Sequence, residues 1–525
     1  MKSFMGRSRM ALLAISVFSL TAPVSHADRV LLEAPDGTVR FEGELIALND
    51  TEYVLQTGAG SIRISRNKVN CTGAGCPTIE KPQADLVIRG SDTVGEELMP
   101  LLIEGYANQL DGSIGRSTKV GADTTSLEVT NMFSSREPVL VTEVQAAGSS
   151  TGLRALIENQ ADIAMSSRPA RPSEVEAVAQ QGRGNILNIS QEYVIAVDSI
   201  LTVISPDNFV NELSVQQVAE IFSGRIRNWS EVGGPNMPVT VYTRPATSGT
   251  RGVFEEKILE PVNFVMSPNA VVLGSNEEIA EAVTRDRGGI GYVGFASKRG
   301  TKPVDLIASC GLRMKATDFS AKTEEYLLER RLRLFVDNGP RTEHERGLLD
   351  FAISSQADAL IQKAGFIDLG IKVSSDPLDT NMLMQSALES NETQSLEALR
   401  RMLNDLNGAQ RLSTTFRFET GSARLDNKSL RDVKRVVDYL SQPQMQNREV
   451  IVAGYTDDFG KFDANARLSE SRAFVALQTL LNHPDAGELR NMRVRSVGYS
   501  ELAPVACNDT TDGQRRNRRV EIWIK

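Results

Sequence analysis

Hydrophobic and polar positions divide the chain into an apolar leader and four longer segments. Met10–Leu20 is a continuous apolar run, with three basic residues and no acidic residue before it. The run is shorter than the roughly 20 apolar residues that cross a bilayer. Small residues at Ser25 and Ala27 suit a cleavage site after Ala27. The pattern predicts a secretory signal over residues 1–27 and an exported mature chain.

Residues 28–80 alternate short β-type runs, such as Val39–Ile46, with turns rich in Gly, Asp and Asn. This period of two predicts a small antiparallel barrel or sheet, and a docking module is its natural role. Cys71 and Cys76 flank Thr-Gly-Ala-Gly, which is flexible enough to close a small ring. Because exported proteins meet an oxidising compartment, we expect a disulfide between these two cysteines.

From residue 84 to 373 the pattern changes to strands that alternate with amphipathic helices. Leu86–Gly90 and Ile195–Ile204 are apolar runs with strong strand character. Alternation of this kind predicts α/β layers with binding crevices at strand ends. About 290 residues are enough for two lobes.

The last two segments are a polar, helix-prone stretch over 374–410 and a compact α/β unit over 411–525. We interpret the first as a helical linker. The second shows helices at Asn427–Ser441 and Arg467–Leu481, with an apolar strand at Val450–Gly454 between them. The expected fold class is therefore multidomain, with a small all-β N-terminal module, a two-lobed α/β part and a C-terminal α/β sandwich.

Composition narrows the range of functions. Hydrophobic residues make up 41% of the chain and charged residues 24%, as in ordinary globular domains. The net charge of −9 argues against nucleic-acid binding, which needs basic residues to neutralise phosphates. Only His344 and His483 remain after the signal, so zinc sites and Ser-His-Asp catalysis are disfavoured. We expect no metal, no cofactor and no catalytic residue; pairing of Cys310 with Cys507 stays open.

The C-terminal unit carries the more specific motifs. Gly454-Tyr455-Thr456-Asp457 ends a strand, Leu468–Ala473 lies in a helix that includes Arg472, and Asn517–Glu521 closes the chain's last strand. Together these motifs resemble the OmpA-like peptidoglycan-associating domain over essentially all of residues 411–525. The resemblance implies that Asp457 and Arg472 bind diaminopimelate of the peptidoglycan stem peptide.

The chemistry of those two side chains supports this role independently. A free amino-acid end carries one ammonium and one carboxylate. A side-chain carboxylate such as Asp457 can accept hydrogen bonds from that ammonium. A guanidinium such as Arg472 can bind the ligand's carboxylate through two parallel hydrogen bonds. Asn465 adds a neutral hydrogen bond. The alternative is a plain surface ion pair between Asp457 and Arg472. The basic run Arg515–Arg519 is more typical of structural ion pairing than of ligand contact.

The central part contains four turns rich in Ser, Thr and Gly. Such turns ahead of helices direct several backbone N–H groups and hydroxyls at one anion, although a single turn more often caps an ordinary helix. Arg244 precedes the last turn by four residues and adds a charged donor. The four turns are Gly90–Thr93, Gly148–Gly152, Ser166–Arg168 and Ser248–Arg251.

With Ala161–Met165, Ile221–Trp229 and Gly288–Tyr292, these turns resemble the phosphate-binding proteins of ABC importers, the PstS-like family, over roughly residues 84–370. The resemblance implies a two-lobed periplasmic-binding-protein fold that closes on its ligand and is not an enzyme. Ser167 stands where well-studied members have an Asp, which leaves sulfate and other small oxyanions open beside phosphate. The implied ligand contacts are Thr93, Val94, Ser149, Ser167, Arg244, Ser248, Gly249 and Thr250.

Three functions follow from these motifs. The first is a peptidoglycan-tethered periplasmic receptor for phosphate or a similar oxyanion, in uptake or sensing, with an ABC permease as a candidate partner and the outer membrane as a candidate neighbour. The second is a structural envelope protein, anchored to peptidoglycan, whose central domain mediates protein contacts. The third, a serine hydrolase, lacks an evident His or Lys beside Ser149 or Ser248. We favour the first.

Overall fold

The computed structural model forms two compact units, residues 1–82 and 83–525. The predicted signal over residues 1–27 lies outside the described residues. Within the described part of the chain, no helix is both long and apolar enough to cross a membrane. The structure describes residues 29–34, 39–48, 52–65, 68–73, 75–76, 84–131, 137–246, 248–374, 393–418 and 424–525.

The first unit is a five-stranded antiparallel sheet in the order β4-β3-β2-β1-β5. Alternate residues of β1 and β3, among them Leu32 and Leu55, point into one small apolar core. Cys71 and Cys76 form a disulfide beside this core. The strands are β1 (Arg29–Glu33), β2 (Arg40–Leu48), β3 (Glu52–Thr57), β4 (Gly60–Ser65) and β5 (Asn70–Thr72).

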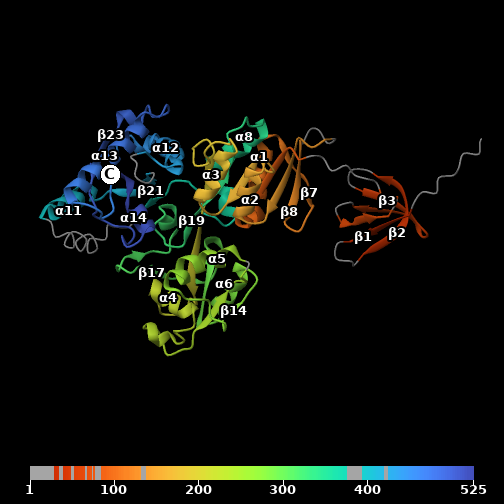
Figure 1. Cartoon of the computed structure of the whole chain (residues 1–525), viewed down its shortest axis with the longest axis horizontal. Helices are drawn as coiled ribbons and strands as arrows, with labels where there is room; N and C mark the ends of the chain where they lie inside the picture. The colour runs from red at the N-terminus through yellow and green to blue at the C-terminus, as the bar shows by residue number, and fades with distance from the viewer. Residues whose placement is uncertain are drawn as a thin grey trace, which may run out of the picture. The chain divides into compact units, whose positions relative to one another are not determined.

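The second unit begins with two α/β lobes that share one long sheet in the order β14-β13-β15-β11-β19-β10-β6-β9-β8-β7, with β16 paired to β11. β11 (Glu192–Ile204) pairs with first-lobe neighbours through its first half and with second-lobe strands through its second half. It pairs with β19 (Glu329–Phe335), which lies between the two lobes in Figure 1. These two strands are the crossing point between the lobes.

Each lobe packs helices on its part of the sheet around a separate apolar core. First-lobe elements are β6 (Leu86–Gly90), η2 (Val94–Leu98), α1 (Met99–Gln109), β7 (Gly112–Lys119), β8 (Thr124–Asn131), β9 (Leu140–Ala146), α2 (Ser149–Ile157), β10 (Ile163–Ser166), α3 (Pro172–Gln180), α8 (Glu343–Ile353) and α9 (Asp358–Lys363). Those of the second lobe include α4 (Val215–Phe222), β13 (Thr240–Thr243), α5 (Gly249–Phe254), β14 (Val271–Val272), α6 (Asn276–Arg285), β15 (Gly289–Gly294) and β16 (Lys302–Pro303).

The C-terminal domain is a mixed sheet in the order β20-β21-β24-β22-β23 with helices packed on it. Leu399, Met402 and Leu406 of α11 are buried against Tyr455 and Trp523. The second half of the expected linker over 374–410 therefore contributes to this core. The elements are β20 (Val373–Ser374), α11 (Thr393–Leu406), β21 (Gln410–Arg417), α12 (Asn427–Leu440), β22 (Glu449–Gly454), α13 (Phe462–Leu481), β23 (Arg493–Gly498), α14 (Thr511–Asn517) and β24 (Arg519–Ile524).

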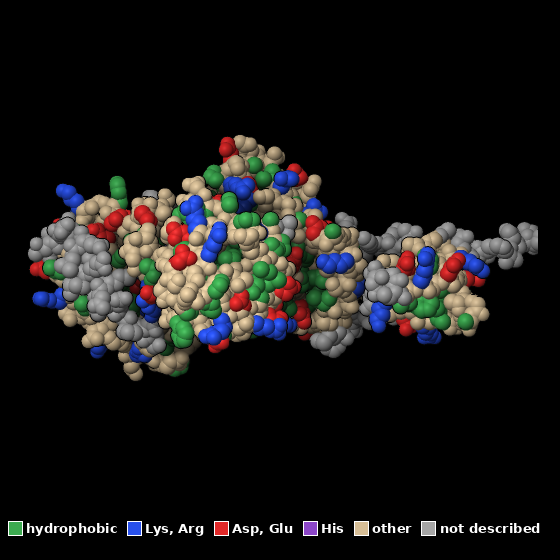
Figure 2. All heavy atoms as spheres, turned by 90° about the horizontal axis from the view of Figure 1, so that it is seen from below, with side chains coloured by type: hydrophobic (Ala, Val, Ile, Leu, Met, Phe, Trp, Pro, Cys, Tyr) green, Lys and Arg blue, Asp and Glu red, His purple; other side chains and the backbone are tan. Residues whose placement is uncertain are grey.

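The predicted fold class is confirmed, with a strand-rich N-terminal module, a two-lobed α/β part and a C-terminal α/β domain. Basic and acidic side chains are interspersed on the face shown in Figure 2. An extended surface of one charge, as a nucleic-acid partner would need, is not seen on that face.

Candidate functional site

The first-lobe side of the candidate anion site is built where parallel strands end together. β10, β6 and β9 are neighbours and parallel, so the turns after them meet at one edge of the sheet. Gly90 has φ 141°, and a Cβ there would lie 2.1 Å from the Met165 carbonyl oxygen. Glycine is therefore required for the chain to turn from β6 toward Thr93.

Ser149 and Ser167 lie together at this edge. The Ser167 N–H donates to Ser149 Oγ over 3.1 Å, and the two hydroxyl oxygens are 3.4 Å apart. Val94 differs, because its side chain is fully buried in the first-lobe core and therefore cannot contact a ligand.

The second-lobe side is built from Arg244, which follows β13, and the turn before α5. Arg244 Nη1 donates to Asn276 Oδ1 over 3.0 Å, and its backbone carbonyl accepts from Arg251 Nη1 over 3.0 Å. The buried Nε of Arg244 has no hydrogen-bond partner among the described residues. Ser248 caps α5 by accepting from the Arg251 N–H over 3.4 Å.

Two adjoining cavities are lined by all of the predicted anion contacts except Val94. A cavity of about 650 Å³ is lined by Thr93, Arg244, Ser248, Gly249 and Thr250. A second, of about 690 Å³, is lined by Ser149, Ser167 and Gly249. Gly249 borders both, and a Cβ on it would meet Asp92 Oδ2 at 3.4 Å and Thr93 Oγ1 at 3.5 Å. The turns of the two lobes therefore face each other closely across the cleft.

Acidic side chains share the first cavity with these donors. Asp92, Glu96, Glu97, Asp198 and Glu277 all line it. Burial, reinforced by the charges of Glu277, Glu96 and Asp198, raises the pKa of Glu97. An anion held here must therefore gain its free energy from short contacts to the donors, because the surrounding field is not uniformly positive.

One residue in the cleft has no counterpart among the predicted contacts. Arg330, near the start of β19, donates from Nη2 to Thr93 Oγ1 over 3.1 Å and from Nη1 to Ser167 Oγ over 3.4 Å. It also lies opposite Asp198 of β11 and donates from Nε to that carboxylate over 2.9 Å. In the sequence it is one of three arginines within four positions (Arg330, Arg331 and Arg333), and no local motif distinguishes it.

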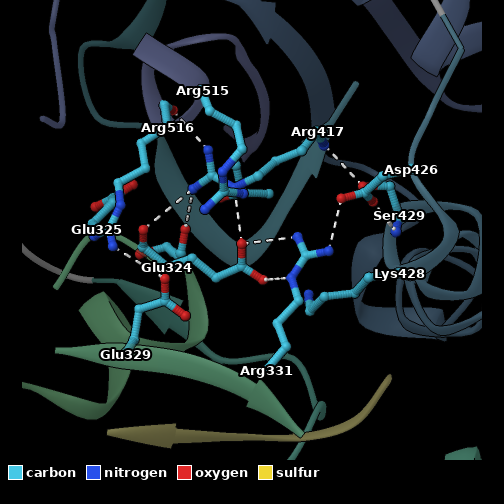
Figure 3. A network of polar contacts seen from close by, with 12 residues as sticks. Glu324, Glu325, Glu329, Arg331, Arg417, Asp426, Lys428, Ser429, Arg515 and Arg516 are labelled. Carbon is cyan, nitrogen blue, oxygen red and sulfur yellow. Dashed lines mark hydrogen bonds and ion pairs between the residues drawn. The ribbon is translucent and has the colours of Figure 1, made fainter. Parts of the chain in front are cut away.

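The other side of β19 contacts the C-terminal domain (Figure 3). Arg331 binds both oxygens of Glu324, at 2.6 and 2.8 Å, and reaches Asp426 Oδ2 at 2.8 Å. Arg417 of β21 donates to Glu324 Oε2 over 3.0 Å, and Arg516 of α14 lies 3.3 Å from Glu329. These charges are buried and mutually paired, which is the arrangement that makes buried charge tolerable.

The candidate peptidoglycan site lies after β22 and on α13. The alternative interpretation, a surface ion pair between Asp457 and Arg472, is not observed, since Asp457 Oδ2 accepts from Arg518 Nη1 over 2.6 Å. Asn465 Nδ2 donates to the Asp457 carbonyl over 3.3 Å and to Glu501 Oε2 over 2.7 Å. Asn465 therefore supports the loop that presents Asp457.

Arg472 is 6% exposed, and its Nε and Nη1 have no hydrogen-bond partner in the described part of the chain. Burial and the neighbouring Arg518 charge lower the pKa of this guanidinium, while Asp457 partly offsets them. A buried guanidinium with unused donors is unfavourable unless an anionic group binds it.

The basic run at 515–519 is divided between two roles. Arg515 and Arg516 pair with Asp512, and Arg519 pairs with Glu521, as the structural interpretation expects. Arg518 instead binds Asp457 and belongs to the candidate peptidoglycan site. Helix α14 ends at Asn517, so Arg515 and Arg516 lie on the helix and Arg518 lies after it. The sequence pattern alone did not predict this helix end.

Comparison with protein families agrees with this division of the chain. Residues 116–352 match the model of the PBP superfamily domain, and residues 417–518 match that of the OmpA family. The chain joins a PBP superfamily domain to an OmpA family domain. The cleft with Arg244 lies in the PBP domain, and Asp457 and Arg472 lie in the OmpA domain.

The PBP part is similar to named relatives. The phosphate-binding protein PstS of Pseudomonas aeruginosa is 28% identical over 282 residues, which span 50% of this chain and 85% of the relative. PstS of Borreliella burgdorferi is 26% identical over 232 residues, 43% of this chain and 78% of the relative. An ABC-type phosphate transport receptor from Vibrio cholerae matches 54% of this chain and 98% of its own, with 25% identity and a TM-score of 0.41.

Proposed function

We propose that this chain is a periplasmic receptor that holds a small oxyanion, phosphate foremost, between the lobes of its PBP domain while its OmpA domain binds peptidoglycan. The observation that carries the first half is Arg244. Its buried Nε has no partner among the described residues, and it lines the same cavity as Ser248 and Thr250. Hydroxyl donors and an unsatisfied guanidinium suit a tetrahedral oxyanion.

The similarity to PstS proteins supports phosphate as the ligand, with uptake or sensing as the role and an ABC permease as the partner. Ser167 replaces the Asp that well-studied PstS-like proteins have at this position. Because a serine provides no carboxylate to accept a proton from hydrogen phosphate, sulfate is the competing ligand to compare. We propose a binding role without catalysis, because neither remaining histidine lines the two cavities.

For the OmpA half, the unsatisfied donors of Arg472 support a role in binding the carboxylate of a diaminopimelate end. Asp457 lies near enough to influence the pKa of Arg472, and its carboxylate is the acceptor for the ligand's ammonium. Peptidoglycan attachment would keep the receptor in the periplasm, next to the outer membrane.

A structural envelope role is the second candidate, and the extensive contact between the PBP and OmpA domains favours it. Isothermal titration of the full mature chain with phosphate, sulfate and a neutral sugar separates the two. A receptor gives saturable heat with one of the oxyanions and none with the sugar. Absence of heat with every anion at low salt would leave the structural role.

A further inference from the structure

Arg330 lines the cavity that holds Ser149, Ser167 and Gly249, although it lies on a crossing strand rather than in any of the four Ser/Thr/Gly turns. Its side chain is 10% exposed and is paired with Asp198 at 2.9 Å. The same guanidinium bridges the hydroxyl oxygens of Thr93 and Ser167, which come from two different turns. It therefore touches two of the three first-lobe turns that the anion is expected to touch.

The hydrogen-bond pattern leaves donors for a ligand. A guanidinium has five N–H donors. Those of Nε and Nη2 are used by Asp198 and Thr93, and Nη1 makes only the long contact to Ser167. A second Nη1 hydrogen has no acceptor among the described residues. Since Thr93 and Ser167 accept from Arg330, their own hydroxyl hydrogens are available to donate.

The backbone on either side of Arg330 is held firmly. Successive strand residues point to opposite faces, and the contacts follow this rule. Glu329 and Arg331 face the OmpA domain, where Glu329 pairs with Arg516 and Arg331 with Asp426 (Figure 3), whereas Arg330 faces the cleft. A donor group fixed in this way binds with little loss of side-chain entropy.

We propose that Arg330 is a further ligand-binding residue of this site, a second guanidinium that contacts the oxyanion from the crossing strand and orients the Thr93 and Ser167 hydroxyls toward it. The inference rests on the proposed oxyanion binding. It assigns the ligand a tetrahedral oxyanion chemistry in which Arg244 approaches from the second lobe and Arg330 from the strand between the lobes.

The test is titration of phosphate and sulfate into the full mature chain and its Arg330→Gln, Arg330→Lys and Arg299→Gln variants. Arg299 is exposed and lines the adjoining cavity that holds Thr93 and Arg244, so its substitution removes one nearby positive charge without removing a contact to the Thr93 or Ser167 hydroxyl. Loss of a charge-assisted contact predicts affinity about 10- to 100-fold lower for Arg330→Gln. Arg330→Lys should be intermediate, and Arg299→Gln should change affinity by less than about threefold.

Because Arg330→Gln leaves Asp198 without its partner, the Asp198→Asn/Arg330→Gln double variant provides a neutral version of the same pair. The double variant should fold, and its affinity for the anion should be at least about tenfold lower than that of the Asp198→Asn variant. A double-mutant cycle with Thr93→Val should show coupling, since the two groups share a hydrogen bond.

The outcomes separate the two hypotheses. If the parent chain gives no heat with either anion, the proposed function fails. If the parent binds and both Arg330→Gln and the double variant bind within about threefold of their references, the assignment of Arg330 is overturned. If Arg299→Gln lowers affinity as much as Arg330→Gln, the effect is general electrostatics and the contact is likewise rejected.

Discussion

At the scale of single residues, both candidate sites depend on guanidinium groups whose donors are incompletely used. Most residues that line the cleft could be predicted from the Ser/Thr/Gly turns, because the residues of each turn are adjacent in the sequence. Arg330 and Arg518 were missed for the opposite reason. Each lies in a run of arginines, and only the pairing of β19 with β11 and the end of α14 show which way they point.

The first residue-scale prediction concerns Arg244. Substitution to Ala should weaken phosphate binding about 10- to 100-fold, because a charge-assisted contact from a partly buried guanidinium is lost. Lys keeps the charge but not the planar fork, so Arg244→Lys should recover only part of the affinity. Titration calorimetry measures both, with Arg285→Ala, on the exposed side of α6, as the control.

A second prediction concerns Arg472 in α13. Arg472→Ala and Asp457→Asn should each reduce co-sedimentation with purified peptidoglycan about tenfold or more, because each removes one charged partner of the zwitterionic end. Arg467→Ala is the matched control, since Arg467 is exposed on the same helix five residues earlier. Undiminished sedimentation of both site variants would exclude the Asp457 and Arg472 assignment.

At the scale of elements, β19 connects the cleft with the OmpA domain. The alternation of strands and helices was readable from the sequence, as was the strand character of β11. The sequence did not predict which residues of β19 face the cleft and which face the OmpA domain. Four of the five residues from Glu329 to Arg333 are charged, so no alternation of apolar and polar residues indicates a buried face. The burial is made possible by ion pairs with residues distant in the sequence, Asp426 for Arg331 and Arg516 for Glu329.

A pH prediction belongs to this element. Burial alone would raise the pKa of Glu324, but Arg331, Lys428 and Arg417 hold that pKa well below its ordinary value. A depressed carboxyl pKa stabilises the fold above the ordinary value, near 4.5, and the stabilisation is lost as pH falls through the folded-state pKa. Acid should therefore weaken this interface.

Glu324→Gln tests this directly by thermal and denaturant unfolding between pH 7 and pH 3. At pH 7 it should cost about 3 kcal/mol, because Arg331 and Arg417 lose their shared carboxylate. The difference from the parent should shrink as pH falls below about 4. Glu281→Gln, in an exposed ion pair on α6, should change stability by less than about 0.5 kcal/mol at every pH. A constant difference across the pH range would contradict the assignment.

At the scale of the whole molecule, the OmpA domain contacts both lobes of the PBP domain. Arg435 of α12 binds Asp358 of the first lobe at 2.8 Å, and the disulfide between Cys310 and Cys507 joins the second lobe to the OmpA domain. The sequence predicted the domains and left this pairing open. The two cysteines lie 197 positions apart, so no local sequence pattern indicates that they pair.

The disulfide makes a prediction at this scale. Cys310→Ser/Cys507→Ser should lower the unfolding temperature of the second unit by several degrees, because a long loop is released in the unfolded state. The disulfide between Cys71 and Cys76 closes a loop of only five positions in the separate first unit, so Cys71→Ser/Cys76→Ser should leave the second-unit transition unchanged. Differential scanning calorimetry distinguishes the two. Equal melting of the second unit in parent and Cys310→Ser/Cys507→Ser chains would show that the covalent tie adds no stability.

The most direct test of the central claim is a single sedimentation experiment with purified peptidoglycan and labelled phosphate. The full mature chain should pellet with the peptidoglycan and carry about one phosphate per chain. Arg244→Ala should pellet without phosphate, and Arg472→Ala should leave the phosphate bound to protein in the supernatant. A parent chain that pellets without phosphate, or binds phosphate but stays in solution, would contradict the account of one polypeptide with two simultaneous ligands.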